Sequence, residues 1–355
     1  MYLMKIALLT PNKNSNGGVE VYNNYLTTIF QDVDIFYYDS NNVKKRGIKK
    51  KLKPFEEIKK SYHVGREFIK AHKKNKYDLV ISNGMFGWYL YFKKVDAVLV
   101  NIYHGNYVGY LKANMNINIK KAIVFSIKGF FERISGYKKQ CITVSKFNQK
   151  QLERYYGLNS SVIHVGVDMS KFKIIPTNEA RELFSFPQNS KLYLFVGRID
   201  ENKGINTILR IAKNNPDIKF IIVGSGSLNS KISNVIHFNG ISNKDMYKLY
   251  SAVNGVLIPS HFESASLVAI ESLATGTPIL MNRTGYSVEI NENFPEFISN
   301  IDDFEVDFKK FNNQVESKYL KEELREWAVK NFSISVFEKR WKSFVKETLE
   351  DNDVF

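Results

Sequence analysis

Short apolar runs alternate with longer segments whose apolar positions recur at helical spacing along most of the 355-residue chain. In the first half, helical patterns cover 19–30 and 55–75, and the short runs lie at residues 5–10, 33–37, 79–82, 97–102, 141–144 and 161–164. In the second half, the short runs lie at residues 192–196, 219–223, 235–239, 255–258 and 278–281. Strands that alternate with helices are typical of βα units that build a parallel sheet.

The strand-and-helix pattern stops once and then starts again. Gly166 and Pro176 interrupt the periodicity between the two series, and such residues mark a loop. A chain of this length usually forms more than one domain, because a single core stops growing at roughly 250–300 residues. We therefore predict an α/β fold with two Rossmann-like, doubly wound domains, at residues 1–170 and 171–335.

Composition agrees with a globular protein, since 44% of the residues are hydrophobic. The single cysteine, Cys141, allows no disulfide within the chain, which fits a reducing compartment. The first apolar run is too short to cross a membrane, and no run of 18 apolar residues follows it. We therefore expect a cytoplasmic protein that is soluble or bound peripherally to the inner face of the membrane.

The net charge of +15 is distributed unevenly along the chain. Residues 1–170 carry 28 Lys and Arg against 12 Asp and Glu, whereas residues 171–355 carry 23 against 24. The densest basic run extends from Lys44 to Lys53. This run can form a solvated loop, contact an anionic membrane, or bind the phosphates of a lipid carrier or of a nucleic acid. We expect peripheral contact with an anionic membrane through it and no nucleic-acid partner.

Glycines follow several predicted strands, at the sheet edge where open α/β sheets bind ligands. Gly17 and Gly18 precede the helical pattern at 19–30; they either let a ligand approach the backbone or form a turn. After the strand at 192–196, Gly197 leads into a loop with Arg198 and Lys203. These two cations either converge on a diphosphate or lie separately on the surface.

The segment after the strand at 255–258 has the most specific pattern. Glu263 and Glu271 are eight positions apart, and a helix that begins near Ser266 places Glu271 in its second turn. Carboxylates there can accept hydrogen bonds from the hydroxyls of a sugar or ribose. A helix-capping glutamate and a surface glutamate that bind no ligand would give the same sequence pattern. The backbone N–H groups that would face a bound anion belong to Ser266, Leu267 and Val268.

Taken in order, these segments resemble the retaining glycosyltransferase family 4, also called glycosyl transferases group 1, of the GT-B fold. The E-x7-E mark of that family is matched by Glu263 and Glu271, and its V-G-R-x4-K-G segment by the residues from Val196 to Gly204. Weaker matches cover the glycine loop, H-G, V-S and G-V-D elements, at Gly17-Gly18, His104-Gly105, Val144-Ser145 and Gly166-Val167-Asp168. The resemblance spans residues 17 to 289.

The resemblance implies a donor site for a nucleotide sugar. Arg198 and Lys203 would hold the diphosphate and stabilise the departing nucleoside diphosphate. Glu271 would bind the ribose, and Glu263 and His104 would contact the donor sugar. Other expected donor-binding groups are Gly17, Gly18 and Gly197 and the N–H groups of Ser266, Leu267 and Val268.

The same resemblance implies a retaining reaction that needs no cofactor and no metal. The GT-B fold implies that the two domains face each other across a cleft, with the acceptor bound by the first domain. It also implies that residues 336–355 form a helix that crosses back onto the first domain; Phe337 and Trp341 there have helical spacing. The acceptor would be a glycan or a lipid-linked molecule of surface polysaccharide or glycolipid biosynthesis.

The chain departs from the family pattern in one place, because Ser266 stands where many relatives have glycine. The Asp32-Val33-Asp34 triplet resembles the metal-binding D-x-D of another transferase fold, and we expect no metal there. The main alternative is a non-catalytic, nucleotide-sugar-binding subunit of a transferase pair. A sugar-nucleotide epimerase, a phosphorylase-like enzyme and a nucleic-acid binder fit the motifs less well.

Overall fold

The computed structural model describes residues 4–13, 17–39, 55–113, 117–228, 231–315 and 318–350. The chain divides into two compact units. Unit 1 comprises Met1–His164 and Phe337–Phe355, and unit 2 comprises Val165–Val336. The chain therefore first passes from one unit to the other between residues 164 and 165, whereas the sequence pattern placed this boundary after residue 170.

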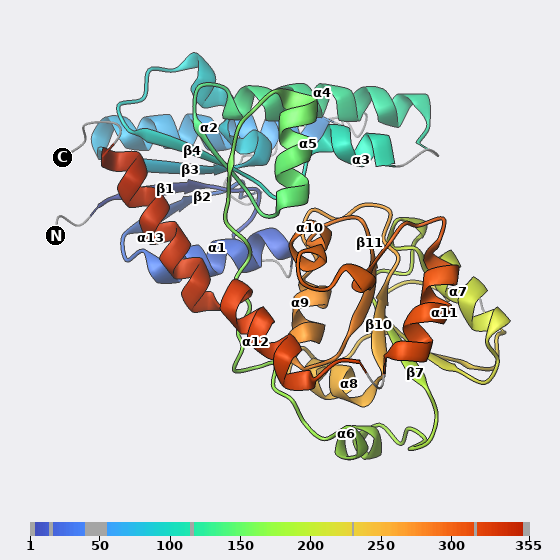
Figure 1. Cartoon of the computed structure of the whole chain (residues 1–355). Helices are drawn as coiled ribbons and strands as arrows, with labels where there is room; N and C mark the ends of the chain where they lie inside the picture. The colour runs from blue at the N-terminus through green and yellow to red at the C-terminus, as the bar shows by residue number, and fades with distance from the viewer. Residues whose placement is uncertain are drawn as a thin grey trace. The chain divides into compact units, whose positions relative to one another are not determined.

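Unit 1 contains a six-stranded, fully parallel sheet (Figure 1). Its strand order is β2-β1-β3-β4-β5-β6. The strands are β1 (Ile6–Leu9), β2 (Val33–Phe36), β3 (Leu79–Asn83), β4 (Val98–Tyr103), β5 (Gln140–Thr143) and β6 (Ser161–Val162). The helices are α1 (Gly18–Ile29), α2 (Glu56–Lys74), the 3-10 helix η2 (Gly84–Phe92), α3 (Tyr107–Ala113), α4 (Ile119–Gly136) and α5 (Lys146–Tyr156).

Two helices of unit 1 show why the chain begins and ends them where it does. The side chains of Asn118 and Ser145 accept hydrogen bonds from backbone N–H groups in the first turns of α4 and α5, and so cap both helices. Helix α5 ends at Gly157, whose φ of 65° suits glycine. The helix limits therefore follow from local side-chain chemistry.

Unit 2 repeats the architecture with a second six-stranded parallel sheet, in the order β12-β11-β10-β7-β8-β9. Its strands are β7 (Leu192–Val196), β8 (Lys219–Val223), β9 (Val235–Phe238), β10 (Gly255–Ile258), β11 (Ile279–Asn282) and β12 (Ile298–Ser299). Its helices are α6 (Thr177–Leu183), η3 (Glu201–Lys203), α7 (Ile205–Asn214), α8 (Met246–Ala252), α9 (Leu267–Ala274), α10 (Ser287–Asn291), η4 (Pro295–Phe297), α11 (Phe304–Gln314) and α12 (Lys321–Phe332).

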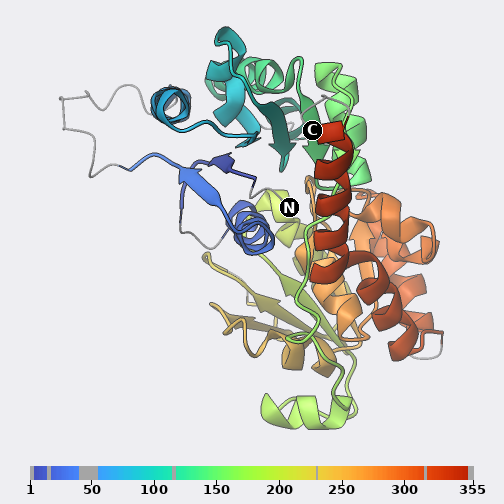
Figure 2. The same cartoon turned by 90° about the vertical axis from the view of Figure 1, so that its left-hand side faces the viewer.

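Helix α13 (Ile334–Glu350) brings the end of the chain into unit 1 (Figure 2). The buried Trp341 donates a hydrogen bond from Nε1 to the hydroxyl of Tyr22 on α1, at 3.0 Å. The ring of Phe337 packs edge-on against Tyr22, with 4.9 Å between the ring centroids. The apolar face of the last helix is thus covered by α1.

The predicted two-domain α/β fold is confirmed, and each of the eleven predicted strands coincides with a strand to within two residues. The short edge strand β12 was not predicted. The basic run from Lys44 to Lys53 lies outside the described residues. No helix in the described part of the chain is both long and apolar enough to cross a membrane.

Candidate functional site

Three loops meet at the carboxyl edge of the unit 2 sheet. They follow β7, β10 and β11, which are neighbours in the sheet, so parallel pairing brings their ends together. The backbone N–H of His261 donates to the carbonyl of Asn202 at 2.8 Å, which joins the β7 and β10 loops. The N–H of Gly285 donates to the carbonyl of Glu263 at 3.0 Å, which joins the β10 and β11 loops. Backbone hydrogen bonds therefore fix the three loops against one another.

Gly204 and Gly224 are needed for the close approach of the loops at this edge of the sheet. Gly204 has a φ of +77°, and a Cβ there would lie 2.2 Å from the carbonyl oxygen of Pro259. Gly224, after β8, has a φ of +159°, and a Cβ there would lie 1.7 Å from the carbonyl oxygen of Gly197. Any side chain at either position would push the loops apart.

Lys203 and Glu263, both predicted site residues, form an ion pair across these loops. The Nζ atom of Lys203 lies 2.5 Å from Oε1 of Glu263. Their side chains are only 25% and 14% exposed, so water screens this pair less than a surface pair. Ser260 donates a second hydrogen bond to the same Oε1 atom, at 2.9 Å, and Asn282 donates to the carbonyl of Ser260 at 2.8 Å. The ammonium and the carboxylate are thus held in place.

Arg198, the other predicted cation, lies in the β7 loop with 68% of its side chain exposed. Its Nη2 atom lies 3.4 Å from Oδ2 of Asp200. Asp200 also accepts a hydrogen bond from the backbone N–H of Lys203, at 3.0 Å. Lys203 is therefore fixed by Glu263, whereas Arg198 pairs with Asp200 and remains mostly exposed to solvent.

Glu271 lies on α9 and is fixed by Tyr250 on α8. The Tyr250 hydroxyl donates to Oε2 of Glu271 at 2.8 Å, and its backbone carbonyl accepts from Thr277 at 2.8 Å. Burial raises the pKa of the Glu271 carboxyl, and the Tyr250 hydrogen bond opposes that rise. Glu271 therefore presents an oriented carboxyl group whose charged form is costly without a further hydrogen-bond donor.

Helix α9 begins where the sequence predicted, with Ser266 as the residue before its first turn. The side chain of Ser266 makes no capping hydrogen bond. Because the first N–H groups of a helix have no carbonyl partner within it, those of Leu267 and Val268 can bind an anion at this end. Gly285 packs here as well, since a Cβ on it would lie 3.3 Å from the N atom of Ser266.

His104, a predicted site residue of unit 1, joins a polar network at the edge of the other sheet. The Nε2 atom of His104, after β4, lies 2.7 Å from Oδ1 of Asn83 at the end of β3. Asn83 donates to Asn23 on α1 at 3.2 Å, and Asn23 donates to Thr10 at 2.9 Å. Asn23 lies on α1, which begins at Gly18 directly after Gly17. A Cβ on Gly18 would meet no atom within 4 Å, so this position is open.

His104 is held in its neutral form. Burial lowers the pKa of its imidazole to about 4, although the nearby Glu20 carboxylate favours the charged ring. The ring also packs edge-on against Tyr22, with 4.9 Å between the centroids. An uncharged imidazole at neutral pH can give or accept a hydrogen bond without adding charge.

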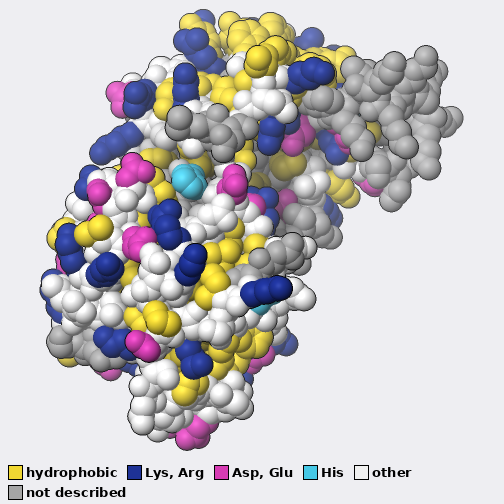
Figure 3. Space-filling model, turned by 90° about the vertical axis from the view of Figure 1, so that its right-hand side faces the viewer, with side chains coloured by type: hydrophobic (Ala, Val, Ile, Leu, Met, Phe, Trp, Pro, Cys, Tyr) yellow, Lys and Arg dark blue, Asp and Glu magenta, His cyan; other side chains and the backbone are white. Residues whose placement is uncertain are grey.

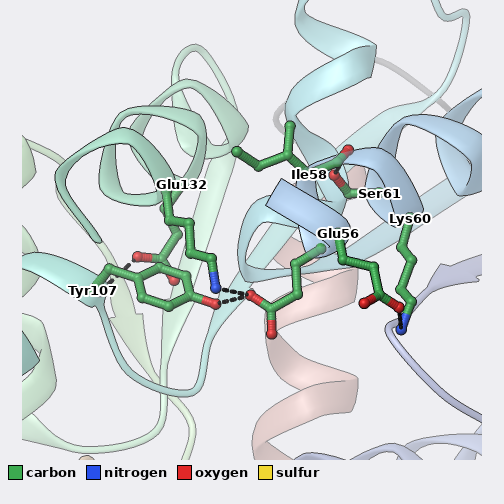
Figure 4. A network of polar contacts seen from close by, with 8 residues as sticks. Glu56, Ile58, Lys60, Ser61, Tyr107 and Glu132 are labelled. Atoms are coloured by element: carbon green, nitrogen blue, oxygen red, sulfur yellow. Dashed lines mark hydrogen bonds and ion pairs between the residues drawn. The ribbon is translucent and has the colours of Figure 1, made fainter. Parts of the chain in front are cut away.

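A second network ties α2, α3 and α4 together in unit 1 (Figure 4). Oε2 of Glu57 accepts hydrogen bonds from Lys128 and from the Tyr107 hydroxyl, both at 2.6 Å. Oε2 of Glu132 accepts from the backbone N–H of Tyr107 at 2.9 Å and from Tyr156 at 2.6 Å. Burial raises the pKa of Glu132 to about 7, against the lowering effect of these hydrogen bonds. The network fixes α3, which follows the His104 loop.

The partners that orient the predicted residues were missed by the sequence analysis. Asn83 and Asn282 are the last residues of β3 and β11, so a polar residue at the carboxyl end of a buried strand was a usable signal. Tyr250 and Ser260 gave no such signal, because only the folded chain brings them to Glu271 and Glu263.

Metal-binding geometry is absent from the described residues. No group of three or more His, Cys, Asp or Glu side chains there is arranged to hold an ion. In the D-x-D triplet, the Oδ2 atom of Asp34 accepts a hydrogen bond from the Tyr77 hydroxyl at 2.6 Å and lies 3.8 Å from the Nζ atom of Lys5. Those contacts account for Asp34 as a structural residue.

Comparison with protein families gives matches to both halves of the chain. Residues 177–331 match the family described as Glycosyl transferases group 1. Residues 17–171 match the family described as Glycosyltransferase Family 4. The two matches include every predicted site residue.

Individual relatives agree with the family matches. The D-inositol 3-phosphate glycosyltransferase of Mycolicibacterium smegmatis is 32% identical over 139 residues, which are 35% of this chain and 32% of the relative. The chain spans only about a third to a half of the length of the curated relatives it matches.

Solved structures resemble the whole chain. Sucrose-phosphate synthase from Thermosynechococcus elongatus has a TM-score of 0.78 at 20% identity, covering 98% of this chain and 100% of that one. Anabaena HepE, solved in complex with UDP-glucose, has a TM-score of 0.71 at 14% identity, covering 97% and 100%. At these identities the likeness shows the fold.

Proposed function

Because the chain belongs to the group 1 glycosyltransferases of the GT-B fold, we propose that it transfers a hexose-type sugar from a nucleoside diphosphate sugar to an acceptor. The acceptor we propose is a glycan or a lipid-linked molecule of surface polysaccharide or glycolipid biosynthesis. The observation that carries the proposal is the edge of unit 2, where an oriented ammonium, two oriented carboxyl groups and a helix N-terminus lie together. Those are the groups that a diphosphate flanked by ribose and sugar hydroxyls requires.

Each group has a distinct task in this proposal. Lys203 and Arg198 bind the diphosphate, together with the N–H groups at the start of α9. As the anomeric C–O bond breaks, negative charge builds on the leaving phosphate, and cations already in place stabilise that charge. The ion pair with Glu263 holds Lys203 in position before the donor arrives, so little reorganisation is needed.

The carboxyl groups of Glu271 and Glu263 bind hydroxyl groups of the donor. Glu271 accepts hydrogen bonds from the ribose, which supplies the donors that its buried carboxylate lacks. Glu263 binds the hydroxyls of the transferred sugar while it retains Lys203 and Ser260. We propose that the neutral His104 also hydrogen-bonds this sugar. The acceptor hydroxyl then forms the new bond with retention of the anomeric configuration, and its proton passes to the leaving phosphate.

Several finer points remain predictions. The UDP-glucose complex of HepE supports a nucleotide-sugar donor for this chain. We propose that no metal is required, so transfer should continue in the presence of a chelator. The reducing, cytoplasmic setting and the membrane contact through the run from Lys44 to Lys53 are likewise proposals.

A donor panel tests the proposal. The chain is incubated with UDP-, GDP- and ADP-linked hexoses and with glycan or lipid-linked acceptors, and release of the nucleoside diphosphate is measured. We expect release from donors of one base, increased by the correct acceptor, and an NMR spectrum showing that the anomeric configuration of the product matches the donor. An inverted product would contradict the retaining mechanism. Donor binding without turnover of any pair would favour the alternative, a non-catalytic nucleotide-sugar-binding subunit.

A further inference from the structure

The surface formed by the end of η2 and by α4 exposes large apolar side chains. Phe92 and Phe130 are each 59% exposed, and Ile119 on the first turn of α4 is 79% exposed. Figure 3 shows hydrophobic side chains gathered over η2 and α4, at the top of the view, with lysine and arginine side chains beside them. We call this the η2–α4 surface and define its apolar part as Tyr91, Phe92, Ile119, Ile123, Phe130 and Tyr137.

These side chains lie on one continuous face. On α4, Ile119, Ile123 and Phe130 are spaced by four and seven residues, which places them along one side of a helix. Tyr91 and Phe92 lie with ring centroids 5.0 Å apart at the end of η2. Tyr91 also contacts Tyr137, which follows α4, at 5.7 Å. The two elements therefore expose a common apolar surface.

The scaffold beneath the surface is firmly built. Trp88 in η2 donates a hydrogen bond from Nε1 to Ser61 on α2 at 2.7 Å. Its ring packs against Phe131 on α4 and against Phe92, at 4.8 Å and 6.2 Å. The exposed rings thus extend from packed elements, and their exposure does not come from a frayed chain end.

The charge around these rings is strongly positive. Between residues 84 and 140 the sequence has two acidic residues, Asp96 and Glu132, against nine basic ones, Lys93, Lys94, Lys112, Lys120, Lys121, Lys128, Arg133, Lys138 and Lys139. Glu132 is buried, and Asp96 pairs with Lys76 at 3.5 Å. Lys128 pairs with Glu57 and Lys139 donates to the carbonyl of Gly87, which leaves seven of the nine basic side chains exposed. Lys138 lies over the ring of Tyr137 at 5.7 Å, and Lys93 lies over Tyr89 at 5.1 Å. Lysines therefore border the aromatic side chains.

We propose that the η2–α4 surface binds an anionic phospholipid bilayer, with the rings inserted at the level of the headgroups and the lysines on the lipid phosphates. An amphipathic surface with aromatic and aliphatic residues on one part and lysines around it is typical of interfacial membrane binding. Protein interfaces, by contrast, are depleted of lysine, so a protein partner fits this surface less well. The inference rests on the proposed function only for the lipid-linked acceptor, which such a contact would bring within reach.

Vesicle flotation tests the proposal with the full chain. Wild type is expected to float with vesicles that contain phosphatidylglycerol and to float much less with pure phosphatidylcholine. The variant Phe92→Ser/Phe130→Ser should lose about tenfold or more of its vesicle binding, since two large apolar side chains no longer insert. The matched control is Leu183→Ser/Leu320→Ser, which removes two side chains of unit 2 that are 61% and 70% exposed and should leave binding unchanged.

The charge contribution has its own variant. Replacing the exposed Lys93 and Lys94 by Gln should weaken binding to phosphatidylglycerol vesicles roughly tenfold, whereas the same change at Lys213 and Lys244 of unit 2 should not. A melting temperature equal to wild type would show that each variant folds.

Three results would overturn the proposal. One is unchanged vesicle binding in Phe92→Ser/Phe130→Ser, and another is vesicle binding that depends only on the run from Lys44 to Lys53. The third is a dimer in solution that the Phe92→Ser/Phe130→Ser change dissociates, because a second copy would then cover the surface. Release of nucleoside diphosphate from a water-soluble donor is measured on the same samples, so a failure of the proposed transferase activity would be seen separately.

Discussion

The carboxyl edges of the two sheets differ in how they present polar groups. In unit 2, Lys203 and Glu263 form an ion pair across two loops, and Glu271 is oriented by Tyr250. In unit 1, the corresponding edge has uncharged groups, with Asn83 linked to His104. The same architecture thus supports an ion pair across two loops in one unit and an amide–imidazole network, with the Glu20 carboxylate nearby, in the other. The polar groups at the edge of unit 2 suit a diphosphate, because an ammonium and a helix N-terminus there can bind an anion.

Removing the charge from unit 2 should have the largest effect. Lys203→Ala takes away the ammonium that stabilises the leaving phosphate and leaves Glu263 without its ion pair. We expect the rate of sugar transfer to fall by about 100-fold or more, measured as release of nucleoside diphosphate at saturating donor. Lys213→Ala, an exposed lysine on α7, should retain the wild-type rate. Equal rates in the two variants would show that the edge of unit 2 is not the site of chemistry.

The Glu271 carboxyl should affect donor binding more than the rate. Glu271→Gln keeps the size of the side chain and its contact with Tyr250 but removes the charge that accepts ribose hydrogen bonds. We expect the donor Kd to rise about tenfold, as for the loss of a charge-assisted hydrogen bond, with little change in turnover at saturation. Titration calorimetry with the nucleoside diphosphate measures this directly. An unchanged Kd would separate Glu271 from the ribose.

The neutral state of His104 gives a pH test of unit 1. Its folded pKa of about 4 lies below its usual 6.5, so the unfolded chain takes up the proton first as the pH falls. The contribution of His104 to the free energy of unfolding is therefore fully present above pH 6.5 and decreases between pH 6.5 and 4. We expect a decrease on the order of 2 kcal/mol, which is smaller than the whole pKa shift would give because the ring is partly exposed. Denaturant unfolding across this range should show a shallower pH dependence in His104→Gln than in wild type. Identical slopes would mean that folding does not lower the pKa of this imidazole.

Glu132 should show the opposite and smallest effect. Its folded pKa of about 7 lies above its usual 4.5, so its contribution to stability decreases as the pH rises from 4.5 to 7. Glu132→Gln keeps an oxygen that can accept from Tyr107 and Tyr156, without the buried charge. We expect this variant to be about 1 kcal/mol more stable than wild type at pH 8 and no more stable at pH 4. A variant that is less stable at pH 8 would show that the charge itself is needed by this network.

Strand positions in the sequence bring the predicted residues of unit 2 together more directly than those of unit 1, for a physical reason. Loops after parallel strands meet at one edge, so strand positions favour bringing Lys203, Glu263 and Glu271 to the same edge of the sheet, and the family resemblance implied their common role at the donor. The Lys203–Glu263 ion pair itself was not predicted, because the family resemblance implies separate roles for these two residues at the donor. Asn23 lies on α1, and only the packing of that helix reveals its link to Asn83.

Surface properties were the least predictable part of the chain. The sequence predicted membrane contact through the lysine run that ends at Lys53. The exposed rings of Phe92 and Phe130 lie within segments whose apolar composition is typical of a buried core. Apolar residues give the same pattern whether a helix buries them or leaves them in water. Only the packing of η2 against α4 decides which of their rings remain exposed.

The central claim is that unit 2 binds the diphosphate of a nucleotide-sugar donor through Lys203 and the start of α9. The most direct measurement is the melting temperature of wild type, Lys203→Ala and Lys213→Ala with UDP, GDP and ADP. One nucleotide at about 100 times its Kd should stabilise wild type and Lys213→Ala by roughly 2.7 kcal/mol, and Lys203→Ala should show little or no shift at the same concentration. Equal shifts in all three proteins, or no shift with any nucleotide, would contradict this assignment.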